Sequence, residues 1–121
     1  MNIKFLNGTA FEYIDAVETE EFYNGASRRT LAFECEAEAI GVDLLNSVLS
    51  NEENTKSITL ENAEENAVNI YDDYQLKLKC GIENRLVKSE TPDMPAVYTD
   101  RLVFKLGKRT YIEEQLKKLG I

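Results

Sequence analysis

Three glutamates and a cysteine lie within five residues of one another in the stretch from Arg28 to Leu49, RRTLAFECEAEAIGVDLLNSVL. Glu34, Glu36 and Glu38 alternate with apolar positions, as in a strand whose side chains point to opposite faces in turn. At a strand rise of about 3.3 Å per residue, neighbouring carboxylates would lie about 6 to 7 Å apart. Carboxylates at that separation can act as the paired acids of glycoside hydrolysis or hold a hard cation.

The simpler interpretation is that these glutamates form the solvated face of a strand. Every alternating strand produces this spacing, and like charges on an exposed face discourage pairing with foreign strands. Cys35 points the other way, toward the apolar side with Leu31 and Phe33, so we expect a buried thiol there. The pattern therefore favours a solvated face over a catalytic or metal-binding cluster.

The remaining composition gives little support for catalysis. The chain has no histidine, which removes the most common general base and most transition-metal sites. Two separated cysteines, Cys35 and Cys80, cannot complete a zinc site, and the glycines match no phosphate-binding motif. The pair Asp72-Asp73 could bind a cation but is more simply a bulge or turn. We therefore expect a protein that is not an enzyme and has no cofactor or metal.

The distribution of charge suggests a protein partner. The net charge of -8 makes attraction to nucleic acid or an anionic membrane unfavourable, whereas residues 96–121 carry six basic and three acidic side chains. The basic residues Arg101, Lys105, Lys108 and Arg109 alternate partly with apolar ones. They are either ordinary cations on an exposed strand or an interface for an acidic surface, such as the Glu34, Glu36 and Glu38 face of a neighbouring copy.

Hydrophobic periodicity and turn residues place these side chains on secondary structure. In the first half, the pattern predicts a hairpin of 3–6 and 9–17 around Asn7-Gly8, a short strand at 22–23, a strand from 30 to 38 and a helix over 42–50. In the second half, it predicts a strand at 58–61, a long strand over 68–82 interrupted at 72–73, an exposed loop over 88–95, a strand over 96–106 and a closing helix.

The closing helix has a well-defined start. Thr110 and Glu113 have the spacing of a capping box, and Ile112, Leu116 and Leu119 would then line one side of the helix.

These elements predict a single domain over residues 1–121. The connections are too short for parallel crossovers, so we expect an α+β fold: an antiparallel curled sheet, sandwich or barrel-like, with one central helix packed on it and a short C-terminal helix. Cys35 and Cys80 should be free thiols in a reducing compartment, and they could pair only if the fold places their Cα atoms within about 7 Å of each other. No apolar run is long enough for a membrane span and no secretion signal is present, so the chain should be cytoplasmic when synthesised.

Several stretches together resemble a known class of proteins: RRTLAFECEAEAIGVDLLNSVLSNEENTKSITL, IYDDYQLKLKCGI and RLVFKLGKRTYIEEQLKKLG. The order is an arginine-led amphipathic strand, a helix ending in an Asn-rich turn, a Tyr-Asp-x-Tyr strand, and a last strand running into a short charged helix. This is similar to small virion structural proteins of tailed phages and prophages of Gram-positive bacteria. The resemblance covers about Arg28 to Gly120.

The resemblance implies a structural role in the tail or baseplate of a virion. Tail-tube and hub proteins of such phages use a curled antiparallel sheet with a helix at one side and stack as rings, and their lumens tend to be acidic. The Glu34, Glu36 and Glu38 face would then be lumenal. Because no long assembly loop is obvious in the sequence, a baseplate, adaptor or accessory role is favoured. The alternative is a small acidic binding module that inhibits or adapts a cationic partner.

Overall fold

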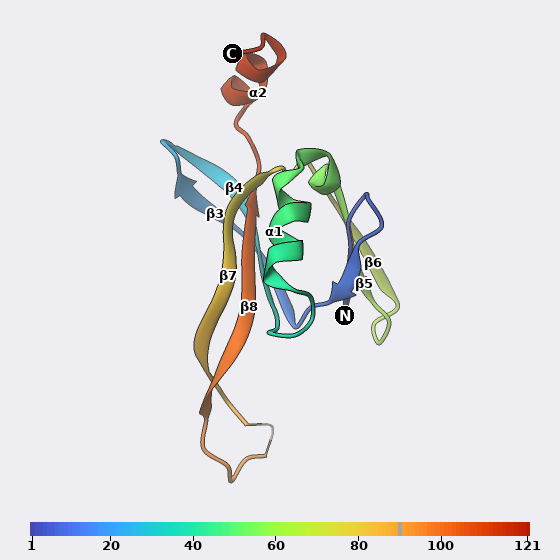
Figure 1. Cartoon of the computed structure of the whole chain (residues 1–121), viewed down its shortest axis with the longest axis vertical. Coiled ribbons are helices and arrows are strands. Elements are labelled where there is room, and N and C mark those ends of the chain that lie inside the picture. The colour runs from blue at the N-terminus through green and yellow to red at the C-terminus, as the bar shows by residue number, and fades with distance from the viewer. Residues whose placement is uncertain (90) are drawn as a thin grey trace.

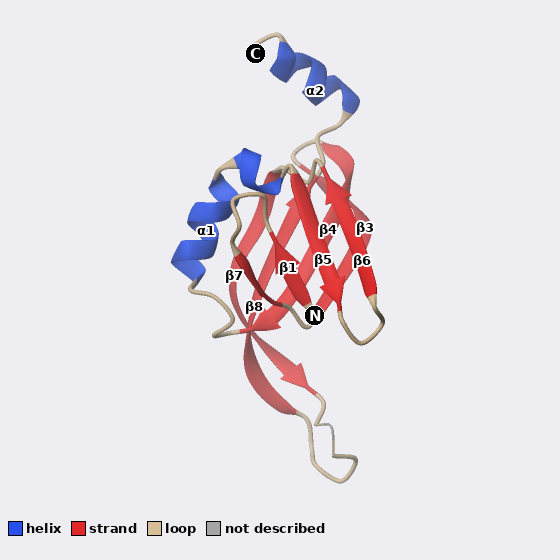
Figure 2. Cartoon of the chain, turned by 90° about the vertical axis from the view of Figure 1, so that its right-hand side faces the viewer, coloured by secondary structure: helices blue, strands red, loops and turns tan. Residues whose placement is uncertain are grey.

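The computed structural model describes residues 1–89 and 91–121, which form an α+β fold built on two four-stranded antiparallel sheets. The sheets pack face to face as a sandwich, with one helix along its side and a second helix near the C-terminus (Figures 1 and 2). The predicted fold class, a curled antiparallel sandwich with a central and a C-terminal helix, is confirmed.

The elements divide between the sheets as follows. Sheet A contains β2 (Ala10–Glu12), β1 (Asn2–Lys4), β5 (Ser57–Asn62) and β6 (Ala67–Asp72), in that order. Sheet B contains β3 (Asp15–Tyr23), β4 (Ala26–Glu36), β8 (Val97–Gly107) and β7 (Leu76–Val87), in that order. The helices are α1 (Val42–Ser50), the short 3-10 helix η1 (Glu52–Thr55) and α2 (Tyr111–Lys118).

The first predicted hairpin is correct, but its second strand is shorter than expected. β1 pairs with β2, and Gly8 has the positive φ angle of +93° that the turn requires. The chain then changes sheets: the Tyr13 amide donates to the Met1 carbonyl of sheet A, whereas the Ile14 amide donates to the Glu34 carbonyl of sheet B. Residues 15–23 therefore form one strand, β3, and include the residues predicted as a separate short strand.

The predicted long strand over 68–82 is wrong in its topology. β6 belongs to sheet A and β7 to sheet B, and the interruption at Asp72-Asp73 is the point where the chain crosses between them. Asp73 has a φ of +67°, and its amide donates to the Lys56 carbonyl at 2.9 Å. The next residue, Tyr74, is buried. A strand periodicity that continues across such a link cannot show that the two halves pair with different partners.

The core fills the space between the sheets with aromatic and aliphatic side chains. The Phe33 and Phe104 rings stack with centroids 4.6 Å apart, and Phe11 from sheet A lies 6.1 Å from Phe104. Cys35 and Cys80 are free thiols on opposite sides of β8, facing Leu102 and Phe104. Burial raises the pKa of Cys35 to about 12, so this thiol is unreactive at neutral pH.

The helix α1 has the predicted bounds and closes one side of the sandwich. Its residues Leu45, Val48 and Leu49 are buried, and the helix lies beside β7 (Figure 2). In the described part of the chain, no helix is both long and apolar enough to cross a membrane.

Two segments project from opposite ends of the long axis of the molecule (Figure 1). The helix α2 extends from one end. At the other end, the β7–β8 hairpin continues beyond the sandwich, and its connecting residues 88, 89 and 91–95 are exposed, as predicted; Glu90 lies outside the described residues. We call the distal part of this hairpin, residues 82–87 and 97–102, the arm.

We expect Phe104→Ala to lower the free energy of unfolding by about 3 to 5 kcal/mol, because it leaves a cavity in the aromatic core. Phe22→Ala is the matched control, since Phe22 is 78% exposed. Urea unfolding followed by circular dichroism measures both. A loss below about 1 kcal/mol for Phe104→Ala would contradict the central position of this ring.

Candidate interaction sites

The outer face of sheet B brings together four of the predicted charged residues. Glu34 and Glu36 of β4 lie opposite Val103 and Arg101 of β8, and Arg101 Nη1 donates to Glu36 Oε2 at 2.7 Å. The acidic and basic stretches of the sequence therefore neutralise each other within one chain. Glu38 does not join them, because β4 ends at Glu36 and Glu38 lies exposed in the following turn.

Further ion pairs extend this face across the sheet. Arg85 of β7 donates to Glu34 Oε1 at 2.6 Å and to Glu83 Oε2 at 3.0 Å, and Lys105 donates to Glu21 Oε1 at 3.0 Å. The hydrogen bond with Glu34 raises the pKa of Arg85. We call the ion-paired residues Glu21, Glu34, Glu36, Glu83, Arg85, Arg101 and Lys105 the charged face.

The geometry of the charged face does not favour acid–base or metal chemistry. Arginine hydrogen bonds occupy one oxygen of Glu34 and one oxygen of Glu36, and the arginine charges oppose a bound cation. The described residues contain no group of three or more Cys, Asp or Glu side chains placed to hold a metal ion. A small cavity of about 110 Å³ lies on this face, lined by Val17, Ala32 and Val103 among the charges.

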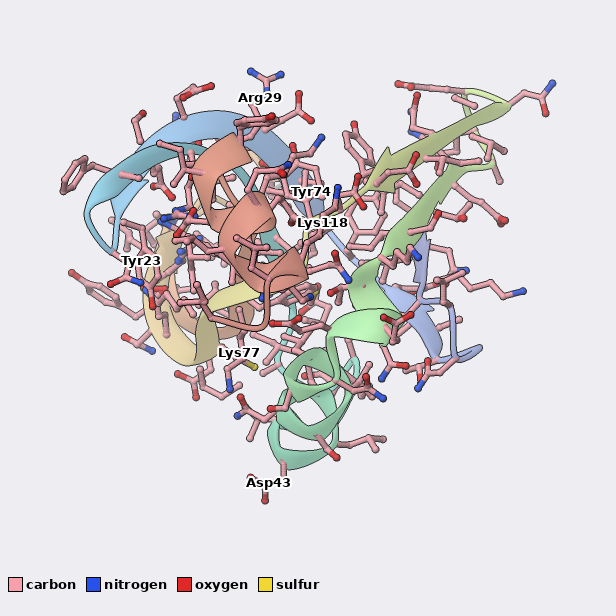
Figure 3. All side chains as sticks on the ribbon, turned by 90° about the horizontal axis from the view of Figure 1, so that it is seen from above. Tyr23, Arg29, Asp43, Tyr74, Lys77 and Lys118 are labelled. Atoms are coloured by element: carbon pink, nitrogen blue, oxygen red, sulfur yellow. The ribbon has the colours of Figure 1, made fainter. Side chains whose placement is uncertain are left out.

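The other two predicted basic residues lie elsewhere. The Lys108 ammonium is 5.0 Å from the centre of the Tyr74 ring, and the Arg109 guanidinium hydrogen-bonds to Glu52 of η1. The Tyr74 hydroxyl donates a hydrogen bond to Glu18 Oε2 at 2.7 Å, and this bond lowers the pKa of Glu18. The predicted basic stretch is thus split between the charged face and the base of α2. Figure 3 shows Tyr74 in the view from above, together with Lys118 of α2.

A buried arginine at the base of α2 was not identified from the sequence. The Arg28 side chain is 1% exposed and makes five hydrogen bonds, matching its five donors. It donates to the carbonyls of Tyr23 and Lys108. It also forms a bidentate pair with the Glu113 carboxylate, at 2.6 and 3.1 Å. The sequence predicts Glu113 as part of a capping box, but no local pattern indicates that Arg28 pairs with it.

This contact fixes α2 to the sandwich. Glu113 also completes the predicted capping box with Thr110, which is confirmed. At the last turn of the helix, Lys117 Nζ donates to Glu52 Oε2 at 2.8 Å. Burial acts to raise the pKa of Glu52, but hydrogen bonds from Lys117 and Arg109 outweigh it and hold that pKa below its usual value. Polar contacts at both ends therefore orient α2.

β3 and β7 are the two edge strands of sheet B, and α1 lies beside the first part of β7. β3 pairs only with β4, and β7 pairs only with β8. β3, with the sequence DAVETEEFY, has four acidic residues and no basic one. β7, with the sequence LKLKCGIENRLV, has three basic residues and one acidic one. The edges of one sheet thus carry opposite charge.

Comparisons of this chain with protein-family models, with curated proteins and with solved structures find no match.

We expect Glu113→Gln to loosen α2. The variant leaves the buried Arg28 charge without its carboxylate, which should cost about 1 to 3 kcal/mol in the free energy of unfolding and speed hydrogen exchange of the α2 amides. Glu114→Gln is the matched control, with the same change of charge one residue later and no ion pair among the described residues. Equal exchange in the two variants would show that Arg28 does not hold the helix.

The same contact predicts a dependence on pH. Hydrogen bonds from Arg28 hold the pKa of Glu113 at about 2, against a usual value of 4.5. Because the folded-state pKa is the lower one, the stabilisation is complete above about pH 4.5 and is lost as the pH falls toward 2. The difference in unfolding free energy between the wild type and Glu113→Gln should therefore shrink over this range. A difference that stays constant in acid titrations would contradict the assignment.

Proposed function

We propose that the protein is a non-enzymatic structural or assembly protein of a phage or prophage virion, from the tail or baseplate, and that it works by self-association. The observation that carries this proposal is the opposite charge of the two edge strands of sheet B. The resemblance to virion proteins of tailed phages supplies the biological setting.

The topology of sheet B suits edge-to-edge association of copies. Each neighbouring pair in the order β3, β4, β8, β7 is antiparallel, so β3 and β7 run in opposite directions. A copy rotated about an axis along the strands would place its β3 beside β7 of the first copy, and the sheet would continue in the antiparallel sense. Such a head-to-tail contact produces a ring if the rotation closes and a filament if it does not.

The charged side chains of the two edge strands discourage foreign strands but are complementary to each other. Neither β3 nor β7 contains a proline, and β3 is nine residues long and largely exposed. The acidic side chains of one edge would meet the basic side chains of the other, and opposite charges across a strand pair are favourable. The charged face is a weaker candidate, because the β4 glutamates at its centre are already paired with arginines of β7 and β8.

A second candidate function rests on the acidic edge alone. β3 could accept a basic strand from a different, cationic protein, as an inhibitor or adaptor would. This alternative predicts a monomer that binds one partner, whereas self-association predicts growth with concentration.

We expect Glu20→Lys, on the β3 edge, to weaken self-association about 3- to 10-fold, because it places a cation opposite the basic β7 edge. Glu64→Lys is the matched control, with the same charge change in the exposed β5–β6 turn. Light scattering after size-exclusion chromatography, at low and high salt, measures the size of the assemblies.

A mixing experiment tests whether the contact joins two different edges. Lys79→Glu should weaken association from the β7 side. An equimolar mixture of the Glu20→Lys and Lys79→Glu proteins still offers one interface with two native edges, so it should form more dimer than either variant alone. A wild type that stays monomeric at all concentrations would refute self-association and leave the binding-module alternative.

A further inference from the structure

The helix α2 is attached to the body by its polar side. Glu113 binds Arg28 and Lys117 binds Glu52, whereas no residue of the helix is buried. Ile112 of the helix and Leu119, its C-terminal cap residue, are 70% and 73% exposed. A surface helix of a globular protein normally turns its apolar stripe to the core. We call Ile112, Leu116 and Leu119 the α2 stripe, and it has no cover in this chain.

The arm, at the other end of the molecule, carries a second uncovered apolar surface. In the β7–β8 register, Ile82 lies opposite Leu102 and Leu86 lies opposite Tyr98, on the same face of sheet B as the core residue Phe104. Leu102 is fully buried, but Leu86 and Tyr98 are 60% and 71% exposed. The core face of sheet B thus continues past the end of the sandwich. We call Ile82, Leu86 and Tyr98 the arm patch.

We propose that the α2 stripe of one copy docks on the arm patch of a second copy, a contact that rests on the self-association proposed above and adds an axial direction to it. The two surfaces lie at opposite ends of the long axis (Figures 1 and 2), so one copy cannot join them internally. A helix packed on a β-ribbon is a standard way of burying an apolar helix stripe. Because the contact joins different surfaces, it propagates from copy to copy.

Charge favours a second copy as the occupant. On the arm patch face, Asn84 donates to Asp100, which is the acidic residue among the apolar ones. The last turn of α2 carries Lys117 and Lys118, and Lys117 is already bound to Glu52. Lys118 is therefore available to meet Asp100 of the next copy.

Disulfide trapping tests the contact directly. In a Cys80→Ala background, with Cys35 buried, we introduce Leu119→Cys into one tagged protein and Leu86→Cys into a second. Under mild oxidation the mixture should form several times more cross-linked heterodimer than a control mixture of Leu44→Cys and Leu86→Cys, in which Leu44 is an exposed α1 residue. Equal yields in the two mixtures would overturn the proposal. Efficient cross-linking of the Leu119→Cys protein with itself would also overturn it, in favour of paired helices.

A variant of the α2 stripe separates this contact from the edge contact. Ile112→Ser/Leu119→Ser changes only exposed residues, so its melting temperature should match the wild type. We expect it to weaken end-to-end growth about 10-fold or more while the smaller, edge-joined assemblies persist, as seen by light scattering and negative-stain images. Unchanged growth in this variant would overturn the axial contact alone. A monomeric wild type would overturn the edge contact and the axial contact together.

Discussion

The buried guanidinium of Arg28 is the interaction on which the ends of the fold depend. It links the β3–β4 turn, the end of β8 and the start of α2, segments that are far apart in the sequence. Removing a charge of this kind from water is costly unless every donor is used, and here all five are. The orientation of α2, and with it the outward direction of its apolar residues, follows from this one pairing.

The charges of the molecule divide into a paired set and an uncompensated set. On the charged face, glutamates of β4 meet arginines of β7 and β8, so the face is nearly neutral despite its high density of ions. The excess of acid remains on Asp15 and Glu20 of β3 and in the turns, since Glu18 and Glu21 are also paired. Association through the edges would leave the pair between Glu36 of β4 and Arg101 of β8 in place, whereas association through the charged face would have to break it.

The sequence predicted the elements better than their partners. The bounds of α1, the capping box of Thr110 and Glu113, and the inward direction of Cys35 followed from local periodicity. The sheet changes after Tyr13 and Asp73 did not, because alternation continues across both links. The pairing of Glu34 and Glu36 with Arg101 depends on the β4–β8 register, which joins residues 65 or more positions apart. No local pattern encodes such a distance, and the same is true of the contact between Arg28 and Glu113.

The central position of β8 has a consequence for how the chain folds. β4 lies in the middle of sheet B, but its second neighbour is the last strand of the protein. During synthesis, β4 can pair with β3 early. It can pair with β8 only after about seventy further residues have left the ribosome. Contacts so distant in sequence are slow to form. Sheet B is therefore completed late, and both its core and the native β7 edge form only after β8 has been made.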